Sequence, residues 1–126
     1  MREVRALLDK ARSKLRVAEK LLELGEYEDA ASRAYYAMLH AARAALASEG
    51  IFPRTHEGVI REFGRLFVKS RRLPRDLGAA ISAAKSLRET ADYSAESVVE
   101  PDDAKWSVEA ARNFVERISE LFKGGS

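Results

Sequence analysis

Residues that favour α-helices dominate this sequence, and the apolar residues among them recur every three or four positions. Alanine alone occurs 21 times in 126 residues, whereas only three prolines and seven glycines interrupt the chain. A three- and four-residue spacing places apolar side chains on one face of a helix, and the helix breakers fall between the periodic segments. None of the segments has the alternation that is typical of a strand. The pattern therefore predicts an all-α protein.

The periodic segments predict about five helices with short connections, which is the pattern of an up-and-down antiparallel bundle. Gly25 suits a helix C-cap, Thr55 an N-cap, and Pro101 the first turn of a helix. In the last helix we expect Trp106 to anchor the core. The expected helices are roughly Arg2–Leu24, Glu26–Glu49, Thr55–Lys69, Pro74–Tyr93 and Pro101–Phe122.

Length and composition restrict the functional classes further. A chain of this size, with 46% hydrophobic residues, fits a single domain over residues 1–123, and we expect residues 124–126 to form a flexible tail. The absence of cysteine excludes disulfides, thiolate zinc sites and cysteine nucleophiles, and two histidines exclude a three-histidine metal centre within one chain. We expect no metal and no cofactor. Without a long apolar run or an apolar signal segment, the sequence predicts a cytoplasmic protein with no membrane association.

Charge is distributed unevenly although the net charge is only +2. Residues 54–88 contain nine Lys or Arg and three Asp or Glu, whereas residues 89–126 contain four and nine. The basic region could present a face to phosphates or to an acidic partner. Alternatively, the acidic last helix neutralises an ordinary solvated bundle surface.

Three polar residues of the second expected helix share one face. Arg33 and His40 are seven residues apart, about 20° from one another around the helix, and Tyr36 lies between them. A partly buried cation in such a row needs a partner, and the pKa of a histidine there can move across neutrality. Two interpretations of the row are possible. It is a functional site for binding or catalysis, or it is a structural polar layer that fixes the register of the bundle. Small residues surround it: Ala34, Ala37, Ala41 and Ala44.

The fourth expected helix offers possible partners for this row. Arg88 and Asp92 are spaced to pair on one face, and Tyr93 follows them. The alternative for this pair is an ordinary surface salt bridge. His56 is a weaker candidate, which either caps its helix or is exposed. The chain has neither the spacing of a histidine metal motif nor a glycine-rich phosphate loop.

Three blocks of the sequence together resemble the HEPN-domain family, specifically its small prokaryotic UPF0332-type proteins. The blocks are GEYEDAASRAYYAMLHAARAAL at residues 25–46, THEGVI at 55–60 with Phe63 and FVK at 67–69, and RETADY at 88–93. The resemblance implies an up-and-down helical bundle that is usually a homodimer. It also implies pairing with a minimal nucleotidyltransferase in prokaryotic modules of the toxin–antitoxin type.

HEPN ribonucleases carry an Arg, four to six residues and then a His, and Arg33 and His40 enclose six. The resemblance implies metal-independent RNA cleavage, with His40 as the general acid or base and Arg33 stabilising charge on the phosphate. Active members have a polar residue directly after the Arg and carry the motif on a late helix, whereas Ala34 follows Arg33 here, on the second helix. Whether this chain is an endoribonuclease therefore stays open. Nucleotide or RNA binding in the same groove is the simpler prediction, through Arg33, Tyr36, His40, Arg88, Asp92 and Tyr93.

The alternative function is that of a non-catalytic helical protein-interaction module. Residues 25–31 are also similar to the opening of a tetratricopeptide repeat. Such repeats have a period of ~34 residues and need about three copies. The sequence contains one copy, so it does not predict a tetratricopeptide fold. The alternative of a protein-interaction role does not require that fold.

Overall fold

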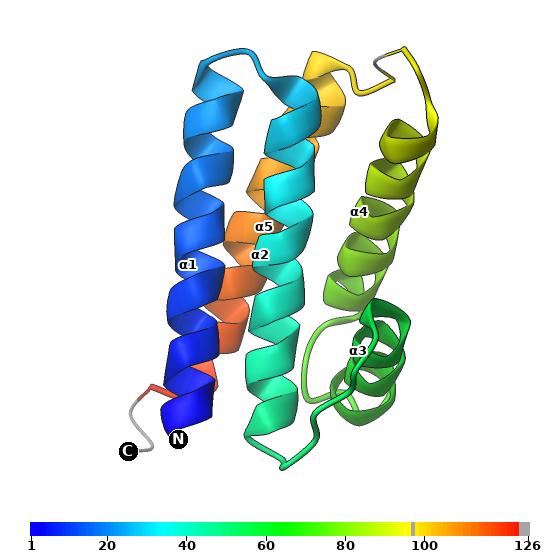
Figure 1. Cartoon of the computed structure of the whole chain (residues 1–126). Helices are drawn as coiled ribbons and strands as arrows, with labels where there is room; N and C mark the ends of the chain where they lie inside the picture. The colour runs from blue at the N-terminus through cyan, green and yellow to red at the C-terminus, as the bar shows by residue number, and fades with distance from the viewer. Residues whose placement is uncertain (97, 124–126) are drawn as a thin grey trace.

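The computed structural model describes residues 1–96 and 98–123, and all its regular structure in these ranges is helical. Figure 1 shows α1, α2, α4 and α5 running alternately up and down, with the short α3 at the lower end. The predicted all-α antiparallel bundle is therefore confirmed, whereas the predicted tail at 124–126 lies outside the described residues. None of the helices in the described ranges is long and apolar enough to cross a membrane. The elements are α1 (Arg2–Glu23), α2 (Tyr27–Ala47), α3 (His56–Phe63), η1 (Gly64–Val68), α4 (Arg75–Tyr93) and α5 (Pro101–Glu120).

Helix α2 is the centre of the bundle. Figure 1 shows it between α1 and α4, with α5 behind it. Most of its side chains are buried, and eight of these are alanines, whose small side chains let the neighbouring helices approach closely. The eight are Ala30, Ala31, Ala34, Ala37, Ala41, Ala42, Ala44 and Ala45.

Local hydrogen bonds fix where two of the helices begin. The Gly58 N–H donates to Thr55 Oγ1 at 2.9 Å, so Thr55 is the N-cap of α3, as predicted. At the start of α5, Glu100 and Asp103 form a reciprocal capping box, and Pro101 occupies the first turn. The Thr55 cap places His56 as the first residue of α3.

The third expected helix differs from the structure. We predicted one helix over Thr55–Lys69, but α3 ends at Phe63 and the chain continues as the π-helical segment η1. The i→i+5 hydrogen bonds of a π-helix rotate the following side chains relative to an α-helix. Within this segment Phe67 is fully buried and stacks on Phe63, with ring centroids 5.7 Å apart.

The prediction that Trp106 anchors the core is wrong. Its side chain is 43% exposed and lies in a groove between α4 and α5, beside Ala79, Ala80 and Ala83. The buried face of α5 instead follows Ser107, Ala111 and Phe114. Trp106 is adjacent to Ser107 in sequence and therefore about 100° away around the helix.

Candidate functional site

One polar stripe interrupts the otherwise buried surface of α2. Arg33, Tyr36, His40 and Arg43 recur every three or four residues along it. Arg33 is exposed, whereas the other three are partly buried. Neighbouring helices cover the other sides of α2, so this stripe is where the central helix meets solvent (Figure 1).

Two tyrosines and two histidines form an aromatic cluster around the middle of this stripe. The Tyr36 ring stacks on the His40 ring, with centroids 6.4 Å apart and planes 28° apart. His56 approaches from the start of α3, 5.8 Å from the Tyr36 ring and 5.9 Å from the Tyr35 ring. The cap at Thr55 thus brings a second imidazole to the stripe.

Helix α4 adds a cation to the same cluster. The Arg88 guanidinium carbon lies 5.1 Å from the Tyr36 ring centroid and 5.7 Å from that of Tyr35. At these distances the cation is attracted to the ring faces. Asp92, one turn further along α4, pairs with Arg88 at 3.4 Å, in the spacing that the sequence predicted. The pair holds the guanidinium over the tyrosines.

The surroundings of His40 favour its neutral form. Burial lowers the pKa of His40 to about 4, and the positive charges of Lys10, Arg43 and Lys14 contribute to the shift. Burial, followed by Arg43, Arg88 and Lys85, also lowers the pKa of His56. His40 is therefore an uncharged imidazole at neutral pH, surrounded by cations.

Several polar atoms of this site have no hydrogen-bond partner within the described part of the chain. They are the buried atoms His40 Nδ1, Arg43 Nε and Tyr35 Oη. An unsatisfied buried polar atom typically costs about 1–3 kcal/mol, so each calls for an explanation. Across residues 1–96 and 98–123, Lys10, Lys14 and Arg43 also lack a carboxylate within salt-bridge distance. The site therefore combines unused donors with an excess of positive charge.

The structure brings four of the six predicted binding residues together: Tyr36, His40, Arg88 and Asp92. Arg33 lies on the same stripe, but seven residues place it about 10 Å from His40 along the helix axis. Tyr93 does not join the cluster, because its side chain is 90% exposed at the end of α4.

Sequence reasoning missed the cations next to His40. Arg43 continues the stripe three residues after His40, so its spacing alone could have identified it. Lys10 and Lys14 are four residues apart on α1, and only the packing of α1 against α2 brings them to His40. Among the described residues, no cluster of three or more His, Asp or Glu side chains could hold a metal ion.

Comparison with known proteins identifies the family of the chain. The sequence model of the HEPN domain matches residues 4–121. The chain belongs to the HEPN domain family. A relative from Methanocaldococcus jannaschii, named "Putative toxin MJ0605", is 36% identical over 121 residues, which cover 96% of this chain and 90% of the relative. A "UPF0332 protein" of Archaeoglobus fulgidus is 35% identical, covering 93% of this chain and 98% of the relative.

A solved structure supports the fold. The crystal structure of TT1696 from Thermus thermophilus aligns with a TM-score of 0.75 and 22% sequence identity. The alignment covers 95% of this HEPN chain and 98% of TT1696. The bundle architecture of this chain is thus shared with an experimentally solved protein.

Proposed function

We propose that this HEPN protein binds the phosphate groups of RNA or of a nucleotide at the His40 site. One observation carries the proposal: neutral His40, with an unpartnered Nδ1, lies among Lys10, Lys14 and Arg43, which have no carboxylate partner in the described part of the chain. A phosphate would supply both the missing hydrogen-bond acceptor for Arg43 Nε and the missing negative charge.

The neighbouring side chains suit a nucleotide better than an isolated phosphate. The Tyr36 ring is partly exposed, so it can pack against a ribose or a base. Arg88 is held over the tyrosines by Asp92 and adds a further cation to the site. A bound phosphate would also offset the cations that lower the pKa of His40, so binding should favour proton uptake by His40.

The biological role that fits this binding is that of a toxin-like component. A relative with 36% identity over 96% of the chain is named a "Putative toxin", and the family resemblance points to a minimal nucleotidyltransferase as the partner. We propose that the chain is a cytoplasmic homodimer that forms such a pair. A non-catalytic interaction module is the competing function, and it requires no ligand at His40.

Metal-independent RNA cleavage is a second candidate function, favoured by the neutral form of His40, because a neutral imidazole has one ring nitrogen that can accept a proton. In this reaction His40 takes the proton of a ribose 2′-hydroxyl, and the 2′-oxygen bonds to the adjacent phosphorus. The P–O5′ bond breaks and the leaving oxygen takes a proton from water. The products are a 2′,3′-cyclic phosphate and a 5′-hydroxyl. Arg43, one helical turn from His40, is closer than Arg33 for stabilising the phosphate.

Phosphate binding is tested by the salt dependence of RNA affinity. Fluorescence anisotropy with labelled single-stranded RNA compares the wild type with Lys10→Gln/Lys14→Gln. Removing two phosphate contacts should weaken binding and reduce the slope of log K against log salt by about 1.4. The matched control, Lys20→Gln/Lys105→Gln, removes two exposed lysines outside the site and should leave the slope close to that of the wild type. Equal slopes for both double variants would contradict the proposal.

Cleavage and partner binding need separate experiments. We expect His40→Ala to abolish cleavage of single-stranded RNA in EDTA while the wild type cleaves, and equal rates would refute the catalytic role. For the interaction module, the complex with the partner should survive Arg33→Ala and His40→Ala. Loss of the complex on these two changes alone would argue against a ligand-independent interaction role.

A further inference from the structure

A cavity of about 290 Å³ adjoins the His40 site at the end of the bundle where α1 begins and α2 ends. Its walls come from α1, from α2 and from the connection between α2 and α3. Arg43 lines the cavity and lies about one helical turn from His40 on the polar stripe of α2, so the cavity and the His40 site share this residue. The lining residues that matter here are Glu3, Leu7, Arg43, Ile51, Phe52 and Pro53.

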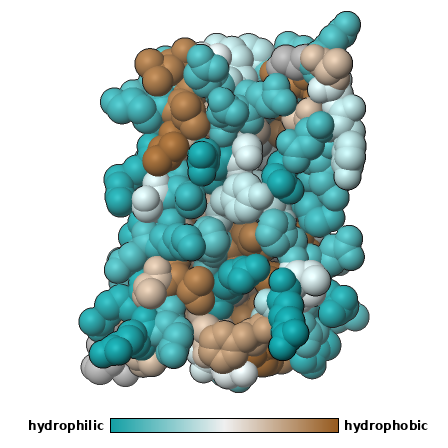
Figure 2. All heavy atoms as spheres, in the orientation of Figure 1, coloured by the Kyte–Doolittle hydropathy of each residue, from teal (hydrophilic) through white to brown (hydrophobic). Residues whose placement is uncertain are grey.

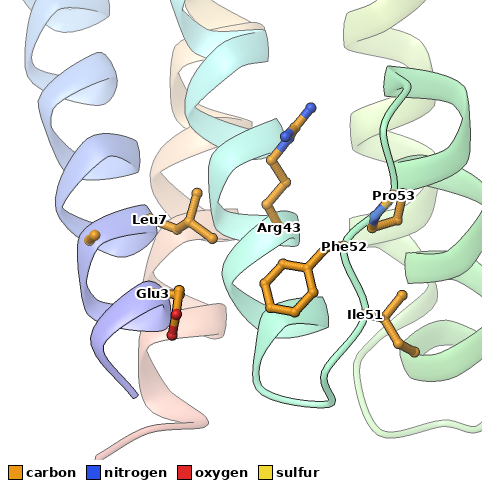
Figure 3. Close-up of a pocket in the computed structure, with 7 residues that line it drawn as sticks. Glu3, Leu7, Arg43, Ile51, Phe52 and Pro53 are labelled. Atoms are coloured by element: carbon orange, nitrogen blue, oxygen red, sulfur yellow. The ribbon is translucent and has the colours of Figure 1, made fainter.

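The walls of this cavity are mainly apolar, with one aromatic ring that is unusually accessible. Figure 3 shows Phe52 extending from the connection toward α1, with Leu7 extending from α1 toward it. Phe52 is 62% exposed although it is a large hydrophobic residue, so most of its ring is available for contact. Apolar side chains are also visible at this lower end of the face in Figure 2, among hydrophilic neighbours. A flat, partly apolar group would cover the Phe52 ring.

Polar groups occur at two edges of the cavity. Glu3 supplies a carboxylate at the α1 edge, which only accepts hydrogen bonds when ionised. Arg43 supplies the other edge, where its buried Nε has no partner within the described residues. The occupant should therefore carry N–H donors at the Glu3 end and a negatively charged group at the Arg43 end.

Helix α1 connects the cavity to the cations of the His40 site. Glu3, Leu7, Lys10 and Lys14 follow one another at three- and four-residue spacing, so they form a single row along α1. Lys10 is about 10 Å from Glu3 along the helix axis, which is comparable to the length of a nucleoside 5′-phosphate. One ligand can therefore reach both ends of the row.

We propose that this cavity is a nucleobase pocket that prefers bases with an exocyclic amino group. This inference rests on the proposed function, because the phosphate of the same nucleotide lies at the Lys10, Lys14 and His40 site. The base covers the Phe52 ring, and its amino group donates to the Glu3 carboxylate. Adenine, cytosine and guanine carry such an amino group, whereas the only base donor of uracil in a nucleotide, N3–H, lies between two carbonyl oxygens that the carboxylate repels.

Base preference and stacking are tested by titrating AMP, CMP, UMP and ribose 5-phosphate into the protein by calorimetry. AMP and CMP should bind about tenfold more tightly than UMP, the effect of one hydrogen bond to a charged group. Ribose 5-phosphate should bind more weakly than all three nucleotides. Phe52→Ala should lower AMP affinity by about tenfold and leave ribose 5-phosphate affinity unchanged. Trp106→Ala is the matched control, because it removes a partly exposed aromatic ring from the α4–α5 groove, and it should change neither affinity.

Glu3→Gln tests the recognition of the amino group, because an amide can also donate to a carbonyl oxygen of uracil. This variant should narrow the tenfold preference for AMP over UMP to about twofold or less. Equal affinity for AMP, UMP and ribose 5-phosphate in the wild type would contradict the proposed base pocket. It would still be consistent with a phosphate site. Failure of all four ligands to bind would also overturn the base pocket, and the proposed function itself would be overturned if single-stranded RNA failed to bind as well.

Discussion

The low pKa of His40 predicts that the protein loses stability as the solution becomes mildly acidic. In an unfolded chain a histidine has a pKa near 6.5, whereas in the folded protein the pKa of His40 is about 4. Between these values the unfolded chain binds a proton that the folded protein does not bind. The free energy of unfolding therefore falls as the pH decreases from about 6.5 to 4, and the contribution of His40 is complete above 6.5.

The size of this effect follows from the same two pKa values. The interval between 6.5 and about 4 corresponds to at most about 3–4 kcal/mol. The imidazole is only partly buried, and solvent screens the charges of Lys10, Lys14 and Arg43, so we reduce the expected loss to about 1–2 kcal/mol.

Urea denaturation of the wild type and of His40→Gln at pH 7.5 and pH 4.5 measures this loss. Carboxylates that titrate near pH 4.5 contribute similarly to both proteins, so their effect cancels in the comparison. The wild type should lose about 1–2 kcal/mol more than His40→Gln on acidification. Parallel pH profiles for the two proteins would refute the reasoning, because they would mean that folding does not change the protonation of His40. His56→Gln should also reduce the loss of stability on acidification, since burial and nearby cations lower the pKa of His56 as well.

Five further substitutions test capping, burial and backbone conformation, with urea denaturation as the measurement in each case. Thr55→Ala removes the oxygen that accepts from the Gly58 N–H and should destabilise the protein by about 1 kcal/mol, whereas Thr55→Ser should restore most of the loss. Phe114→Ala should cost about 3–5 kcal/mol because this ring is fully buried, whereas Trp106→Ala should cost less than about 1 kcal/mol; similar losses for both would contradict the burial seen here. Arg71 has a φ of 65°, so Arg71→Gly should stabilise the protein by about 0.5 kcal/mol, and destabilisation would show that the Arg71 side chain makes a contact of greater value.

The bundle was predictable because its signals are local. The apolar spacing within each segment depends only on the helix repeat, and helix ends such as Thr55 and Pro101 are specified by residues within a few positions of one another. Gly25, expected at a C-cap, adopts a φ of +77° directly after α1. These features can be predicted without knowing which helices pack together.

The errors concern features that depend on packing between helices. An aromatic residue next to a buried position suggests a core residue, yet Trp106 lies on the adjoining side of α5, where α4 presents alanines and leaves a groove. The change from α3 to η1 likewise has no local marker in the sequence. Phe67 of η1 is fully buried, and that burial depends on packing with other elements such as α4.

The candidate site combines both kinds of information. The row from Arg33 through Tyr36 to His40 follows from spacing on a single helix, and so does the pairing of Arg88 with Asp92. Their proximity to His56 and to Lys10 and Lys14 depends on how α1, α3 and α4 pack against α2.

The polar stripe of α2 is not explained by the stability of the bundle. Alanines already cover the contacts of α2 with its neighbours, and apolar residues on the stripe would avoid the loss that an unpartnered His40 Nδ1 or Arg43 Nε imposes. A salt bridge would be a simpler way to place Arg43 there, yet no carboxylate of the described residues lies within salt-bridge distance of it. An arrangement that lowers the stability of the unbound protein, and that an anion would relieve, is expected where binding determines the choice of residues. The unpartnered atoms of His40 and Arg43, together with the cations Lys10, Lys14 and Arg43, therefore support the proposal that this stripe binds an anion.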